Sequence, residues 1–223
     1  MKNIFGNQPV SGENFYGREK FVRLLVGILT SGNSFLLLGL RRIGKSSTIT
    51  ETLRRIKEND KKVEIININC QTYRNIQDFY KHLYLALPLP WQSQLKKVLK
   101  DSKKIPTKII DFITDHVEEV NVGEFGSLKL RNDVINYSTP LKDEITEFFK
   151  KQEKSIIIFI DELPFLFEAI DTENKDKALM EITAILTSLR DWRESGVSLA
   201  ICGSLNLHLQ LENLGISKKL LAG

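Results

Sequence analysis

The segment that most constrains the fold is residues 39–46, with the sequence Gly-Leu-Arg-Arg-Ile-Gly-Lys-Ser. It matches the pattern GxxxxGK[ST], in which glycines allow successive backbone N–H groups to turn inward around a phosphate. Lys45 then reaches the β- and γ-phosphates, and the hydroxyl of Ser46 is a ligand for Mg²⁺. An apolar stretch precedes this loop and an amphipathic stretch follows it. The sequence therefore predicts a strand, a phosphate-binding loop and a helix whose positive end faces the phosphates.

The rest of the chain alternates between strand-like and helix-like stretches. Short apolar stretches predict four buried strands, at residues 34–38, 63–69, 155–160 and 197–202. Apolar residues at helical spacing predict helices at 45–58, 75–86 and 177–194. In the last of these, one face is expected to carry Leu179, Ile182, Ile185, Leu186 and Leu189. The pattern predicts an α/β fold, with a mostly parallel sheet between two layers of helices.

Residues 88–140 break this alternation, and we interpret them as an insertion in a single core domain that spans 1–223. Pro88 and Pro90 cannot continue the helix before them. Two strand-like pieces around glycines at 120–131 predict a β-hairpin. Further helices are expected at 92–104, 107–120 and 141–151.

The insertion is uneven in charge. Residues 96–108 carry six lysines and one aspartate, whereas residues 111–125 carry five acidic residues and no basic one. One interpretation is a basic docking face. The favoured interpretation is two solvated helices that pair their opposite charges.

A second group of polar residues follows the predicted strand at 155–160. Asp161 is placed there to hold Mg²⁺ through water, and Glu162 to polarise a water for attack on a γ-phosphate. At the end of the strand at 197–202, a polar side chain is expected to sense that phosphate. Ser204 is the first candidate and Asn206 the second, although a helix cap explains Ser204 equally well.

Composition excludes several classes of protein. The chain has 223 residues, of which 42% are hydrophobic and 27% charged, so disordered, collagen-like and coiled-coil proteins are excluded. The net charge of +4 is too small to indicate nucleic-acid binding by itself. Cys70 and Cys202 lie in apolar surroundings and are expected to be buried free thiols. Because no signal peptide or membrane span is seen, we expect a soluble cytoplasmic protein with no membrane partner.

Four stretches together resemble the AAA+-related P-loop ATPases, within the archaeal-type ATPases allied to the STAND class (the MNS-like group). The stretch Phe15-Tyr-Gly-Arg-Glu19 is similar to the F-x-G-R-E box of that family. Residues 39–46 are similar to its G-x-R-R-x-G-K-[ST] loop. Asp161-Glu162 resembles its Walker B end, and Cys202-Gly203-Ser204 its sensor-1 strand end.

The resemblance implies a three-layer P-loop NTPase fold with the ASCE strand order 5-1-4-3-2. The fifth strand is not evident, because residues 205–211 favour a helix over a strand. No lid, sensor-2 arginine or arginine finger is recognised, so both a fragment and a naturally small ATPase fit. Without a fifth strand, the first strand would have an exposed edge that favours pairing with another chain.

The resemblance also implies a set of site residues. The catalytic candidates are Glu162, Lys45 and Ser204, and the metal-holding candidates are Ser46 and Asp161. Arg41 and Arg42 either add charge near the phosphates, contact a neighbouring element or face solvent. On the adenine side, Gly17 and Arg18 also fit an ordinary turn at a helix start. The nucleotide-binding candidates are Gly39, Leu40, Arg41, Arg42, Ile43, Gly44, Lys45, Ser46, Ser47, Tyr16, Gly17 and Arg18.

Three functions are weighed on this basis. The first is Mg²⁺-dependent ATP hydrolysis that moves a protein partner or a C-terminal domain absent from this chain. The second is a switch between ATP and ADP states with little turnover, acting through self-association or in toxin, defence or regulatory signalling. The third and weakest is nucleic-acid binding through the lysines at 96–104. ATP is preferred to GTP because no clear [NT]KxD motif is present.

Overall fold

The computed structural model describes residues 9–114, 132–173 and 175–216. Its sheet has four strands, all parallel, in the spatial order β1-β4-β3-β2. Their bounds are β1 Phe35–Leu38, β2 Val63–Asn69, β3 Ser155–Asp161 and β4 Ser198–Gly203. The chain is thus an α/β protein, and each predicted strand is present within one residue at each end. In the described residues, no strand pairs with the outer edge of β1, so the five-strand order stays a prediction.

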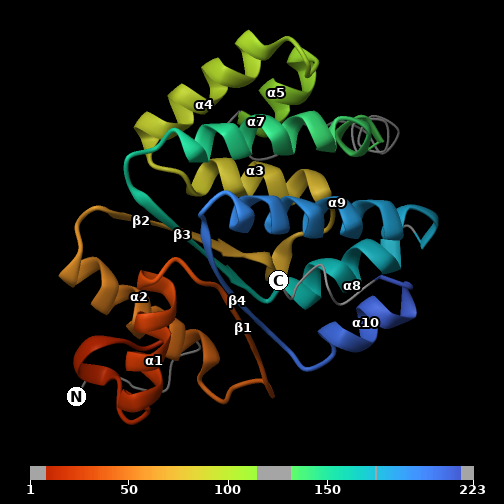
Figure 1. Cartoon of the computed structure of the whole chain (residues 1–223). Coiled ribbons are helices and arrows are strands. Elements are labelled where there is room, and N and C mark those ends of the chain that lie inside the picture. The colour runs from red at the N-terminus through yellow and green to blue at the C-terminus, as the bar shows by residue number, and fades with distance from the viewer. Residues whose placement is uncertain (1–8, 115–131, 174, 217–223) are drawn as a thin grey trace.

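Helices cover both faces of the sheet (Figure 1). Helices α1 (Glu19–Thr30) and α2 (Lys45–Asn59) pack on one face. On the other face lie α3 (Ile76–Ala86), α8 (Leu163–Glu173) and α9 (Lys175–Glu194). This arrangement gives the three layers that the alternation of strands and helices predicted.

Strand β3 shows how the sequence divides its side chains between two cores. Successive side chains of a strand point to opposite faces of the sheet. Ile157 and Phe159 therefore join the core under α1 and α2, whereas Ile158 and Ile160 join the larger core on the other face. Continuing the alternation, Asp161 points to the side on which α2 begins.

The insertion forms an outer tier of helices in Figure 1, away from the sheet. Helices α4 (Leu89–Ser102) and α5 (Thr107–Thr114) pack on each other. Helix α5 also packs on α3, and α4 packs on α7 (Ser138–Lys150), which in turn contacts α9. Pro90 stands in the first turn of α4, where a missing N–H costs nothing. One continuous core joins α4, α5 and the sheet. The predicted hairpin at 120–131 and the end of the helix at 107–120 lie outside the described residues.

Lysines of the insertion have acidic partners. Lys100 pairs with Asp111 at 3.1 Å, which joins the basic stretch to the acidic one as the charge-pairing interpretation predicted. Lys104 pairs with Glu144 at 2.8 Å, outside the acidic stretch. These pairs lie at the surface and add little to stability.

Helix α10 (Leu207–Asn213) follows β4, with Leu207 and Leu211 buried, which confirms the helical interpretation of this stretch. The predicted face of α9 is wrong at one position, because Leu179 is 48% exposed. Ala178, one residue earlier and fully buried, occupies that side of the helix instead. Helix α8 was not expected from the sequence pattern, and the start of α1 was expected only in the interpretation of Gly17 and Arg18 as a helix-start turn. Short 3-10 turns lie at Gly12–Asn14 (η1) and Cys70–Thr72 (η2).

Both cysteines are free and buried, as expected. Within the described residues, no helix combines the length and the apolar character that crossing a membrane requires.

Candidate functional site

The phosphate loop (residues 39–46) joins the end of β1 to the start of α2. Gly44 is the N-cap of α2 and has a φ of 86°, a left-handed conformation that favours glycine. The side chain of Lys45 is folded back into the loop and is only 6% exposed. Its Nζ donates to the carbonyl oxygens of Gly39 at 2.9 Å and Leu40 at 2.8 Å. The ammonium group is therefore held inside the loop by groups that an anion can replace.

The first turn of α2 supplies backbone donors to the same place. No side chain caps this helix end. The first N–H groups of a helix have no partner within the helix, and its dipole adds partial positive charge there. The hydroxyl of Thr48 turns back to the carbonyl oxygen of Gly44 at 2.8 Å and so braces the turn. The loop and the helix start therefore form a site suited to an anion.

The ends of β3 and β4 meet the phosphate loop through a buried thiol. Cys202 donates from Sγ to Oδ1 of Asp161 at 2.9 Å, and Ser46 lies close enough to the thiol to lower its pKa. Burial raises the pKa of Cys202, so its thiol is protonated and able to donate. One series of contacts thus runs from the serine of the loop to the aspartate of the strand end.

Glu162 follows Asp161 in a strained backbone conformation. Its φ is 56°, which costs about 1–3 kcal/mol for a residue other than glycine. Its Oε2 is buried and has no hydrogen-bond partner in the described part of the chain. Burial raises the pKa of Glu162, and the charge of Asp161 adds to this, while Lys45 and Arg41 oppose it. The carboxylate is therefore a better proton acceptor than an ordinary glutamate.

Arg41 extends from the phosphate loop to α8. Its guanidinium carbon lies 4.5 Å from the centre of the Phe165 ring. Arg42 has a left-handed backbone, with a φ of 62°, and its side chain is exposed. The two neighbouring arginines thus differ in surroundings, because in the described residues Arg42 has no hydrogen bond, ion pair or ring contact.

The Phe15–Glu19 stretch lies against the back of the phosphate loop. The guanidinium of Arg18 donates to the carbonyl oxygen of Ile43 and, at 3.2 Å, to the hydroxyl of Thr48. Arg18 is also the N-cap of α1, as the interpretation of a helix-start turn predicted. Tyr16 is 84% exposed. In this structure Arg18 supports the loop, and its predicted contact with adenine stays a prediction.

Residues 10–12 are fastened to α2 just beyond the loop. The backbone N–H of Val10 donates to the hydroxyl of Ser47 at 3.1 Å. The N–H of Gly12 donates to the buried carboxylate of Glu51 at 2.7 Å. These bonds bring Ser47 and the N-terminal segment together beside the phosphate loop.

The end of β4 leaves room for no side chain at Gly203. A Cβ there would lie 2.4 Å from Cδ of Pro164, at the start of α8. Ser204 is partly buried, but it does not cap α10, whose N-cap is Asn206. The capping explanation of Ser204 is therefore wrong, and its sensor role stays a prediction.

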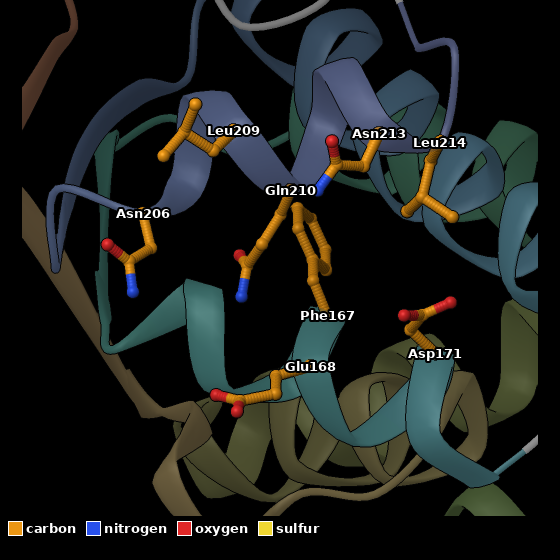
Figure 2. A pocket seen from close by; sticks show the side chains of 8 residues that line it. All are labelled: Phe167, Glu168, Asp171, Asn206, Leu209, Gln210, Asn213 and Leu214. Carbon is orange, nitrogen blue, oxygen red and sulfur yellow. The ribbon is translucent and has the colours of Figure 1, made fainter.

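Asn206 faces a groove between α8 and α10 (Figure 2). Gln210 in the same groove donates to the carbonyl oxygen of Pro164 at 3.3 Å. None of the groove-lining residues belongs to the phosphate loop, and the role of Asn206 as a phosphate sensor stays a prediction. The lining residues are Phe167, Glu168, Asp171, Asn206, Leu209, Gln210, Asn213 and Leu214.

Sequence reasoning missed two contacts at the site, those of Cys202 and Phe165. The alternation along β4 carries a signal for the first, because Cys202 lies two residues after the buried Ala200 of the α2-side core. No local pattern indicates that Phe165 lies under Arg41, because the two belong to elements far apart in the chain.

No protein-family model matches the chain, and no curated protein sequence matches it. Among solved structures, the chain is similar to a Walker-type ATPase of Pyrococcus abyssi, with 20% sequence identity and a TM-score of 0.47. The match covers 94% of this chain and 52% of that chain, so this chain spans about half the length of that protein.

Proposed function

We propose that this chain binds ATP with Mg²⁺ at the phosphate loop and hydrolyses it. The observation that carries the proposal is the contact of the loop with two strand ends. Cys202 is hydrogen-bonded to Asp161 and lies beside Ser46, and the half-buried carboxylate of Glu162 follows Asp161 in the chain. The anion-binding loop, the oxygen ligands Ser46 and Asp161 and the base Glu162 thus belong to one candidate site.

Binding of the phosphates falls to the loop and the start of α2. The ammonium of Lys45 exchanges the carbonyl oxygens of Gly39 and Leu40 for β- and γ-phosphate oxygens. The uncapped N–H groups of α2 donate to the same phosphates. Because these donors are already in position, little reorganisation is needed when charge develops on the γ-phosphate.

The residues at the strand end fit Mg²⁺. The hydroxyl of Ser46 and the carboxylate of Asp161 are hard oxygen donors, which that ion prefers. The thiol of Cys202 lies beside both groups. Held by Ser46 and Asp161, the ion would supply positive charge that offsets the charge of the phosphates. The role of this chain is to present one oxygen from the loop and one from the strand.

Glu162 acts on the attacking water. Its unpartnered Oε2 accepts a hydrogen bond from the water and then its proton, as the water oxygen forms a bond to γ-phosphorus. The bond from γ-phosphorus to the bridging oxygen breaks, and ADP and phosphate leave. The raised pKa of Glu162 suits this transfer, since a base with a higher pKa takes the proton more readily.

We further propose that the cycle moves a protein partner or a domain outside this chain. Two exposed apolar side chains, just beyond the carboxyl ends of neighbouring strands, support this. Leu40 follows β1 and is 67% exposed, and Leu205 follows the neighbouring strand β4 and is 53% exposed. A partner that covers these leucines would sense the state of the phosphate loop, to which Leu40 itself belongs.

Turnover of Mg²⁺-ATP by the wild type, Glu162→Gln and Lys45→Ala tests the proposal, with ATP binding measured by calorimetry in each. We expect turnover in the wild type, and binding without turnover in Glu162→Gln. Lys45→Ala should lose binding. Glu168→Gln is the matched control, because Glu168 lies on α8 in the groove away from the loop and should keep full turnover.

Two outcomes would redirect the proposal. Unchanged ATP affinity in Lys45→Ala would refute a nucleotide site at the loop. Tight binding without turnover in the wild type would refute hydrolysis by this chain and favour the switch between ATP and ADP states.

A further inference from the structure

We infer that Arg41 distinguishes ATP from ADP by moving from the ring of Phe165 to the γ-phosphate. The inference rests on the proposed function and adds to it a residue that reads the nucleotide state. In this structure, the guanidinium carbon of Arg41 lies 4.5 Å from the Phe165 ring centre.

The ring that Arg41 contacts belongs to the first turn of α8, which follows closely on the end of β3. Phe165 lies in the first turn of α8, three residues after Glu162. The backbone N–H of Phe165 donates to the carbonyl oxygen of Glu162 at 3.0 Å. The ring that Arg41 contacts therefore belongs to the same turn as Glu162, the group assigned to the attacking water. That is where the γ-phosphate belongs and where ADP has no group.

The guanidinium of Arg41 can readily exchange its contact with the Phe165 ring for a stronger partner. Arg41 is exposed, and a cation–π contact at an exposed position changes an equilibrium only by about two- to fivefold. A guanidinium binds phosphate oxygens with charge-assisted, often paired hydrogen bonds, which are stronger. A γ-phosphate can therefore displace the ring, whereas without one the ring holds the side chain at the site.

Arg42 provides a comparison within the same loop. It carries the same charge and is also exposed, but in the described residues it has no ring, ion-pair or hydrogen-bond partner. Its charge adds to the general attraction of the loop for phosphates. Such an effect acts on ATP and ADP alike, whereas that of Arg41 acts on ATP.

The test measures dissociation constants for Mg²⁺-ATP and Mg²⁺-ADP by calorimetry, in the wild type, Arg41→Ala, Arg42→Ala and Phe165→Leu. We expect Arg41→Ala to weaken ATP binding by about 10- to 100-fold, as loss of a charged hydrogen bond does, and to leave ADP binding within about twofold. Arg42→Ala should change both constants by the same factor. Phe165→Leu should tighten ATP binding by about two- to fivefold, since it frees the guanidinium.

The outcomes separate this inference from the proposed function. If the wild type binds neither nucleotide, the proposed function fails. If the wild type binds both and Arg41→Ala weakens both equally, the nucleotide site stands and the inference about Arg41 is overturned. Thermal unfolding of each variant without nucleotide shows whether it is folded, and Arg41→Lys provides a second, milder variant. Because lysine lacks the planar fork, it should recover only part of the preference for ATP.

Discussion

Replacement of Glu51 by glutamine tests how firmly residues 10–12 are held beside the phosphate loop. Glu51 lies on α2 with its side chain 1% exposed. Its carboxylate accepts hydrogen bonds from Arg54 at 2.9 Å, from Arg55 at 2.7 Å and from the backbone N–H of Gly12 at 2.7 Å. The hydrogen bond with Arg54, aided by Gly12 and Arg55 and opposed by burial, lowers the pKa of Glu51 from 4.5 to about 2.

This lowered pKa sets the size and the pH range of the effect. At about 1.4 kcal/mol per pKa unit, the drop corresponds to about 3.5 kcal/mol. Arg54 and Arg55 are 36% and 26% exposed, so solvent screens part of this, and we expect about 2–3 kcal/mol. Because ionisation favours the folded state, the contribution is complete above pH 4.5 and is lost as the pH falls toward 2. At pH 3, more than half of it is gone.

The assay is urea unfolding of the wild type, Glu51→Gln and Glu58→Gln at pH 7 and pH 3. Glu51→Gln should be less stable than the wild type by about 2–3 kcal/mol at pH 7, and by less than half of that at pH 3. Glu58→Gln is the control, because Glu58 is 60% exposed on the same helix and its pair with Arg54 should contribute less than about 0.5 kcal/mol. A difference between the wild type and Glu51→Gln that is equal at both pH values would refute the reasoning.

Three further predictions concern the strand ends. Gly203→Ala should lower the free energy of unfolding by about 1–3 kcal/mol in urea, because its Cβ meets the rigid ring of Pro164; no measurable change would contradict this packing. Cys202→Ala should raise the Mg²⁺ concentration needed for ATP binding, whereas Cys202→Ser keeps a donor and should stay near the wild type in a Mg²⁺ titration. The acid limb of the pH–rate profile should have its midpoint above 4.5, because burial raises the pKa of the base Glu162; a midpoint at or below 4.5 would count against that role.

The four strands, the phosphate loop and the helix after it were predictable from local sequence. A strand shows itself as a short apolar stretch, and the helix that starts at Lys45 as an apolar spacing along its own length. Asp161 and Glu162 were recognisable as candidates because they directly follow such a stretch. Helix α8 was not recognised, because its buried residues Leu163, Leu166, Phe167 and Ile170 follow directly on the apolar β3 with only Asp161-Glu162 between.

The contacts that define the candidate site depend on how distant strands are aligned. The thiol of Cys202 reaches Asp161 because β4 lies between β1 and β3 in a particular register, and the sequence of β4 alone carries no register. The same holds for Arg18 on the loop, Phe165 under Arg41 and Pro164 against Gly203. The chemistry of the phosphate loop is thus local and can be predicted from eight consecutive residues. Its surroundings result from packing between elements far apart in the chain, so they become visible only in the folded structure.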